Sequence, residues 1–141
     1  MKKVYLTRKT HFSAAHKLWN DSWSEEKNKE VFGACANPNY HGHNFDMFVT
    51  LVGSPDPDTG FVINLKDLNQ IFKEHIIEII DHKNINLDVH FMKGVIPTTE
   101  NLAIGIWEQL KPLVENEHRK LYCVKLYETE NNFVEYYGEN P

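Results

Sequence analysis

The chain has few cysteines, no long apolar run and no surplus of positive charge, and each shortage excludes a class of protein. Its two cysteines among 141 residues are too few for a disulfide framework, so a reducing, cytoplasmic location is expected. No segment approaches the length of a membrane span, and the opening MKKVYLTRKTHF lacks the apolar core of a signal peptide. The net charge of −5 argues against nucleic-acid binding. We expect one soluble domain over residues 1–141, with no membrane or nucleic-acid partner.

Histidine, in contrast, is plentiful, and a His-X-His triplet is the strongest local signal. In an extended strand residues i and i+2 share a face, so His41 and His43 project together and can bind one metal ion. Catalytic zinc typically takes three protein ligands and keeps an open position. His16 is the best third candidate, and Cys35 is either a fourth ligand or a reactive thiol. The triplet alone is equally compatible with two surface histidines.

Alternating apolar residues predict two strands near the N-terminus. Residues 3–16 alternate with His16 on the apolar parity, and residues 41–53 alternate with both triplet histidines on theirs. The polar stretch 17–40 between them is predicted to be a long loop, of the kind that is often functional. Residues 54–60 (SPDPDTG) predict a turn.

The second half of the sequence predicts two helices and a hairpin. Asn64 is a candidate N-cap for a helix ending near Asp81-His82, and a second helix begins at residues 97–100, with Pro112 limiting its end. Residues 120–128 and 132–137 form the hairpin. The predicted order β-β-α-α-β-β is an α+β fold, with two helices on one face of a four-stranded antiparallel sheet. The uncovered face carries apolar residues, so we expect it to be buried against other subunits.

Several further polar residues have both an ordinary structural explanation and a functional one. Asp81-His82 fits a helix end, or a carboxylate that orients an imidazole acting as acid or base. Glu128 fits an exposed strand end. Capping explains the polar cluster at the start of the second helix, which comprises Thr98, Thr99 and Glu100.

Taken together, these fragments resemble the 6-pyruvoyltetrahydropterin synthase family, which includes the 6-carboxytetrahydropterin synthases of queuosine biosynthesis. The similarity covers nearly the whole chain. It rests on five motifs in the right order: Phe12-Ser13-Ala14-Ala15-His16, Cys35 through Asn44, Asp81-His82-Lys83-Asn84, Thr98-Thr99-Glu100-Asn101 and Tyr127-Glu128-Thr129.

The resemblance implies a site and a reaction. It implies a tunnelling fold assembled as a hexamer of two trimers, with active sites between subunits. Zn²⁺ would be bound by His16, His41 and His43. The substrate would be 7,8-dihydroneopterin triphosphate, which loses triphosphate to give 6-pyruvoyltetrahydropterin, or 6-carboxytetrahydropterin plus acetaldehyde. The implied proton-transfer residues are Cys35, Asp81 and His82, and the implied pterin-binding residues are Glu128, Thr98, Thr99 and Glu100.

The choice between the two products is open from the sequence. The five-residue gap between Cys35 and His41 resembles that of the pyruvoyl-forming animal enzymes, whereas Ala36 and Tyr40 depart from their commoner Asn and Gly. Two other functions compete. The first, a catalytically silent zinc- or pterin-binding subunit, is disfavoured because the proton-transfer residues are present. The second, a simple metal hydrolase, needs a carboxylate near the metal that the sequence does not clearly place.

Overall fold

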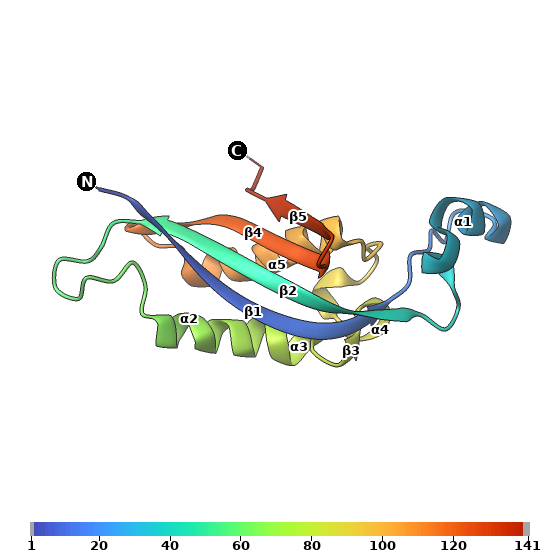
Figure 1. Cartoon of the computed structure of the whole chain (residues 1–141), viewed down its shortest axis with the longest axis horizontal. Coiled ribbons are helices and arrows are strands. Elements are labelled where there is room, and N and C mark those ends of the chain that lie inside the picture. The colour runs from blue at the N-terminus through green and yellow to red at the C-terminus, as the bar shows by residue number, and fades with distance from the viewer. Residues whose placement is uncertain (1, 140–141) are drawn as a thin grey trace.

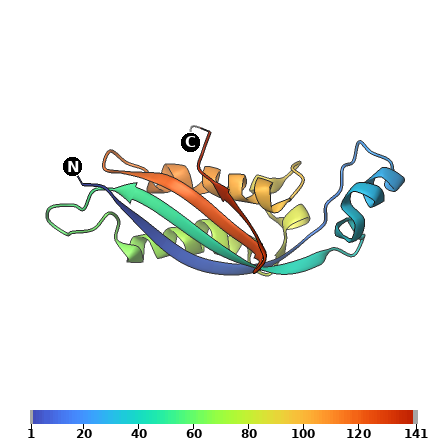
Figure 2. The same ribbon diagram turned by 45° about the horizontal axis from the view of Figure 1, so that its top comes forward.

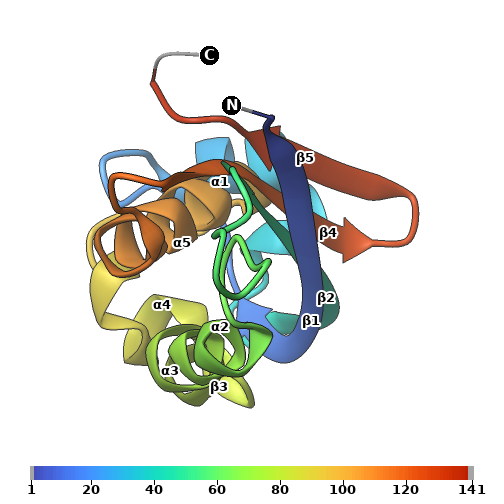
Figure 3. The same cartoon turned by 90° about the vertical axis from the view of Figure 1, so that its left-hand side faces the viewer.

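A five-stranded sheet with helices on one face forms the protein, as seen in a computed structural model that describes residues 2–139 (Figures 1 and 3). Its spatial order is β3-β1-β2-β4-β5. The strands are β1 (Val4–His16), β2 (His41–Gly53), β3 (Lys83–Asn84), β4 (Arg119–Thr129) and β5 (Asn132–Tyr136).

Strands β1 and β2 pair antiparallel along their whole length, from Val4 opposite Gly53 to His16 opposite His41. The predicted parity is confirmed, since Phe12, Phe45 and Met47 are essentially inaccessible to solvent while their neighbours in sequence are less buried. The histidines continue this buried series to the last rung of the ladder. The same alternation that builds the core therefore sets the direction of the metal-ligand candidates.

The prediction of four antiparallel strands is wrong in one respect, because the sheet is mixed and has a fifth strand. β3 pairs parallel to β1, with Lys83 opposite Ala14 and Asn84 opposite Ala15. A strand of two residues has no alternation to detect, so its pairing is visible only in three dimensions. It attaches the chain directly after Asp81-His82 to the end of β1.

The first predicted helix exists, but it is interrupted. Asn64 caps α2 (Leu65–Phe72) by accepting the Lys66 N–H, and the chain continues through a π-helical segment, η2 (Lys73–Ile77), into α3 (Glu78–Ile80). Its buried side packs on the sheet. The helix ends immediately before Asp81, as predicted.

The second helix, α5 (Thr99–Val114), is capped by the Thr98 side chain, which accepts the Asn101 N–H. It continues past Pro112, the residue predicted to limit it, and ends two residues later. Pro112 has no N–H to donate, so the helix loses one backbone hydrogen bond in its last turn and can still continue to Val114. At the C-terminal end of α5, Val114 is fully buried and Leu113 is 38% exposed.

The predicted loop 17–40 contains two short helices, α1 (Glu25–Phe32) and a 3₁₀ turn, η1 (Gly33–Ala36), and projects beyond the end of the sheet (Figure 2). We call residues 17–40 the arm. Ser24 caps α1, and the fully buried Asn28 side chain bonds the main chain of Asn20 at 2.7 and 2.9 Å. Polar bonds rather than an apolar face hold α1 in place, so its sequence has no apolar periodicity from which the helix could be predicted.

Two further short elements, α4 (Ile85–Asp88) and η3 (His90–Met92), connect β3 to α5. The core lies between the sheet and the helices. Among the described residues, no helix is both long and apolar enough to cross a membrane. The largest fully buried side chains are Phe12, Phe45, Met47, Leu51, Leu68, Ile76, Ile80, Ile85, Leu102, Ile106, Leu110 and Leu126.

Candidate metal centre and adjoining cavity

Three histidines meet at the end of the β1–β2 ladder, on the helix-covered side of the sheet. The ring centroids of His16 and His41 lie 4.5 Å apart, those of His16 and His43 lie 5.0 Å apart, and those of His41 and His43 lie 4.9 Å apart. One ring nitrogen from each residue lies within 4.8 Å of the other two. The structure thus brings together all three residues that the sequence suggested as ligands.

Each of the three rings holds a buried nitrogen without a hydrogen-bond partner: Nε2 of His16, Nδ1 of His41 and Nε2 of His43. Leaving one such atom unpaired costs about 1–3 kcal/mol, so three in one cluster need an explanation. Burial also lowers the pKa of His16 and of His41, which favours the neutral imidazole, the form that binds metals. The cluster therefore has the donor chemistry of a metal site.

The donor set fits Zn²⁺ or a similar divalent ion. Zinc–nitrogen bonds of about 2.0–2.1 Å in tetrahedral geometry require ligand atoms about 3.4 Å apart, so modest ring rotations complete the site. Three protein ligands leave a fourth position free, the arrangement typical of catalytic zinc.

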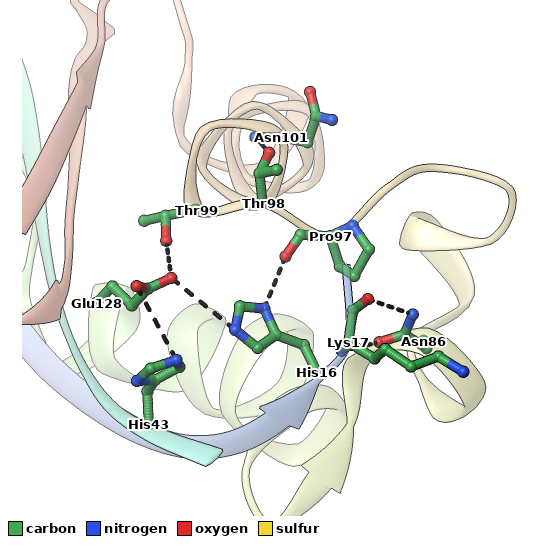
Figure 4. Close-up of polar contacts among 9 residues, drawn as sticks. All are labelled: His16, Lys17, His43, Asn86, Pro97, Thr98, Thr99, Asn101 and Glu128. Carbon is green, nitrogen blue, oxygen red and sulfur yellow. Dashed lines mark hydrogen bonds and ion pairs between the residues drawn. The ribbon is translucent and has the colours of Figure 1, made fainter. Parts of the chain in front are cut away.

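His16 is oriented from behind by the main chain. Its Nδ1 lies 2.8 Å from the Pro97 carbonyl oxygen (Figure 4). A carbonyl only accepts hydrogen bonds, so Nδ1 carries the proton and Nε2 presents its lone pair to the cluster. This is the usual way in which a metal-binding histidine is fixed, and the sequence alone did not indicate this contact.

Glu128 places a carboxylate beside the candidate metal ligands, a position that the sequence could not identify. From β4, its Oε2 lies 3.9 Å from Nε2 of His16 and its Oε1 lies 3.9 Å from Nε2 of His43. Thr99 donates its hydroxyl to Oε2 at 2.7 Å, which fixes the carboxylate (Figure 4). The start of α5 and the end of β4 are thereby joined beside the histidines.

A cavity of about 250 Å³ opens next to Glu128 and the start of α5. All four residues that the resemblance assigned to pterin binding line this cavity, although 28 positions separate Glu100 from Glu128. Part of the wall comes from the arm and part from the hairpin. The lining residues are Leu18, Thr98, Thr99, Glu100, Glu128, Asn132, Phe133 and Val134.

Cys35 lies in η1 on the arm, half-buried and without a disulfide partner. Its carbonyl accepts the Leu18 N–H at 2.7 Å, which holds it opposite the residue two positions after His16. It is not a member of the three-histidine ligand group in the described part of the chain.

Asp81 and His82 form a pair on the other side of β1. Asp81 Oδ2 lies 3.0 Å from Nδ1 of His82, and Asp81 Oδ1 accepts the Ser13 N–H at 2.8 Å. The Ser13 hydrogen bond is the main reason that the pKa of Asp81 is lowered. His82 has a left-handed backbone (φ 60°), held by donation of its N–H to the Ser13 carbonyl, and its side chain is 83% exposed. The predicted carboxylate–imidazole pair therefore forms.

This pair and the three histidines are two separate groups within one chain. His82 borders a hollow of about 550 Å³ whose wall also includes Ser13, Asn44 and the ligand candidate His43. His16 and His43 belong to the core-facing parity of their strands. Among the described residues, no polar contact links the pair to the histidines or to Glu128.

Comparison with known proteins finds related pterin synthases that match almost the whole chain. A family model described as 6-pyruvoyl tetrahydropterin synthase matches residues 5–139. The 6-pyruvoyl tetrahydrobiopterin synthase of Homo sapiens is 46% identical over 137 residues, which cover 97% of this chain and 93% of that protein. The 6-carboxy-5,6,7,8-tetrahydropterin synthase of Bacillus subtilis is 26% identical over 136 residues, with 93% and 83% covered.

The fold matches solved structures of the same kind. The 6-pyruvoyl tetrahydropterin synthase of Caenorhabditis elegans superimposes with a TM-score of 0.92 at 40% identity, covering 99% of this chain and 98% of that one. The chain belongs to the 6-pyruvoyl tetrahydropterin synthase family.

Proposed function

We propose that this protein is a zinc-dependent pterin synthase that removes triphosphate from 7,8-dihydroneopterin triphosphate. The observation that carries the proposal is the cluster of three buried, unpartnered ring nitrogens next to the cavity that Glu128 borders. His16, His41 and His43 would bind the metal. Bound there, Zn²⁺ supplies Lewis-acid polarisation of the substrate's side-chain hydroxyls, which makes the neighbouring protons easier to remove.

Glu128 and the start of α5 would hold the pterin ring. A carboxylate accepts two parallel hydrogen bonds from an amino-pyrimidine edge, as it does from Arg. The Thr99 hydroxyl already fixes one Glu128 oxygen at 2.7 Å, which restricts the carboxylate to few orientations. Thr98 and Glu100 line the same cavity. Capping of α5 and substrate binding would thus share the same residues.

Proton transfer would be divided between Cys35 and the Asp81–His82 pair. Cys35 would act as the general base on the substrate side chain, and His82, oriented by Asp81, would relay the other proton. Among the described residues of one chain, His82 contacts Asp81 and makes no polar contact with the ligand histidines, and its side chain is 83% exposed. We therefore propose that His82 serves the site of a neighbouring chain.

The outer face of the sheet supports assembly. Tyr5, Tyr122 and Phe133 are 59%, 41% and 46% exposed on it, a large aromatic surface for a monomer. Most of β1 and the outer side of β5 also present open edges, which further chains can pair with. We propose a hexamer of two trimers, which native mass spectrometry would record as about 99 kDa, six times the 16.5 kDa chain.

The product we favour is 6-pyruvoyltetrahydropterin. The 46% identity to the human enzyme, against 26% to the carboxy-forming Bacillus enzyme, and the five-residue gap between Cys35 and His41 both support it. The test is incubation with 7,8-dihydroneopterin triphosphate, mass analysis of the pterin, and assays for triphosphate and acetaldehyde. Acetaldehyde would identify the carboxy branch, and unchanged substrate would identify a silent subunit.

Mixing of inactive variants tests the shared site. Cys35→Ala and His82→Ala chains should each retain the metal and lose most turnover. Refolded together in equal amounts, they should recover roughly a quarter of wild-type activity by random assortment, because some sites then combine both intact residues. A site contained within one chain predicts no recovery.

A further inference from the structure

His16 is held by contacts from outside the sheet in addition to the β1–β2 ladder. His41 and His43 lie on β2, whose ladder with β1 includes both residues. His16 is the last residue of β1, and its ladder partner His41 is likewise the first residue of β2. A ligand at a frayed strand end would lose the geometric precision that metal binding requires. Something beyond the sheet must therefore fix it.

One fixing contact comes from α4. The side-chain amide of Asn86 accepts the Lys17 N–H at 2.9 Å and donates to the Lys17 carbonyl at 2.9 Å (Figure 4). These two bonds imitate one rung of a β-ladder. They extend the β3 side of β1 by two positions beyond Ala15, its last partner in β3, and so hold the main chain immediately after His16.

A second contact holds the His16 ring itself. The Pro97 carbonyl that binds Nδ1 sits in a three-residue turn closed by the Thr98 N–H, which donates to the Ile96 carbonyl at 2.9 Å. Asn101, from the first turn of α5, donates its side-chain amide to the same Ile96 carbonyl at 2.9 Å. Asn101 thus fastens the turn that aims the Pro97 carbonyl at the histidine.

We infer that Asn86 and Asn101 are positioning residues for the metal ligand His16, one fixing its main chain and the other its ring. This rests on the proposed metal site and adds two residues to it. Both are only half-buried, so simple packing does not explain the two bonds that Asn86 makes to the Lys17 main chain or the bond from Asn101 to the Ile96 carbonyl. Loss of contacts behind a metal ligand commonly weakens metal affinity by about 10–100-fold.

The test is titration of chelator-treated protein with Co²⁺, whose visible absorption reports coordination geometry. Asn86→Ala and Asn101→Ala should each weaken Co²⁺ binding by about 10-fold or more and alter the absorption of the bound ion. If either variant fails to fold, the Asp replacement stands in for it. Asp at position 86 keeps the acceptor for the Lys17 N–H, and at both positions it removes the amide donor and adds a negative charge.

Asn116 offers the matched control. Its Oδ1 accepts the N–H groups of His118 and Arg119 at 2.8 and 3.1 Å, at the opposite end of the sheet. Asn116→Ala should lower the melting temperature of the metal-free protein comparably and leave Co²⁺ binding unchanged. If Asn86→Ala and Asn101→Ala bind Co²⁺ as Asn116→Ala does, the positioning role is refuted. If wild-type protein itself binds no Co²⁺, the proposed metal site falls, and this inference falls with it.

Discussion

Replacing His43 with Leu should stabilise the metal-free protein and destabilise it relative to wild type once metal is present. His43 holds a buried Nε2 without a partner beside two similar atoms, and its ring already packs edge-on against Phe45. Leu has a similar volume and no polar atom to leave unpaired. The low end of the usual 1–3 kcal/mol cost applies, about 1 kcal/mol, because the His43 side chain is 18% exposed.

The size of the reversal can be worked out in advance. A gain of about 1 kcal/mol raises the melting temperature of a domain of this size by about 3–4 °C. Zn²⁺ at 100 times its dissociation constant stabilises wild type by about 2.7 kcal/mol, or roughly 10 °C by the same conversion, and should stabilise the variant far less. The order of the two melting temperatures therefore inverts between chelator and zinc.

Calorimetry or fluorescence melting of both proteins, with chelator and with Zn²⁺, measures this directly. His118→Leu is the control, because His118 is 66% exposed and lies far from the cluster. It should change neither melting temperature appreciably. The reasoning is wrong if His43→Leu is the less stable protein in chelator, or if zinc raises both melting temperatures equally.

Three further outcomes are expected. Thr99→Val removes the hydroxyl bonded to Glu128 and should raise the KM for the substrate by about 10-fold, in line with a charged hydrogen bond of about 1.5–3 kcal/mol, with a smaller effect on kcat. Asp81→Asn should lower the free energy of unfolding by about 1–2 kcal/mol near pH 7, because the lowered pKa of Asp81 stabilises the fold above the unfolded carboxyl pKa. That difference should vanish as the pH falls through the folded pKa, which urea denaturation across acid pH would measure. Asn28→Ala should open the arm to limited proteolysis while leaving exchange protection of the sheet amides unchanged.

Each of these has a result that would contradict it. Thr7→Val is the control for Thr99→Val, because it removes an exposed hydroxyl that lies 2.7 Å from the Thr50 hydroxyl on the outer face of the sheet. If Thr7→Val raises the KM as much as Thr99→Val does, the Thr99 hydroxyl has no specific role in substrate binding. A pH-independent loss of stability in Asp81→Asn would mean that the carboxylate charge does not matter. Cleavage spread over the whole Asn28→Ala chain would mean that the arm is not a separate unit of stability.

The long strands and the clustering of the candidate metal ligands were predictable because both follow from alternation. His16, His41 and His43 share the parity of the buried residues on β1 and β2, and antiparallel pairing of those strands brings their ends together. The caps Asn64 and Thr98 were predictable because their side chains act on the next few residues. Alternation and capping each relate residues only a few positions apart, so a local sequence pattern reveals them.

The contacts that could not be predicted join segments far apart in the chain. The Pro97 carbonyl reaches His16 across 81 positions, and Glu128 reaches the same ring across more than a hundred. Neither a carbonyl nor a lone strand-end carboxylate has a pattern that identifies its partner. The helix in the arm was missed for a different reason. Ser24 followed by Glu25 and Glu26 is a proper helix start, but no apolar stripe follows it.

The place where β1 ends and β2 begins has a consequence for how this protein can vary. Both ligand strands stop at the rung that pairs His16 with His41, and the arm spans the interval between them. Residues inserted into the middle of the arm lengthen a loop at small entropic cost and leave the ladder register untouched. A single residue inserted inside either strand would instead turn the ligands beyond it onto the wrong face. The fold therefore accommodates a change in arm length, whereas a change in the length of either strand would displace the candidate metal ligands from the core-facing side.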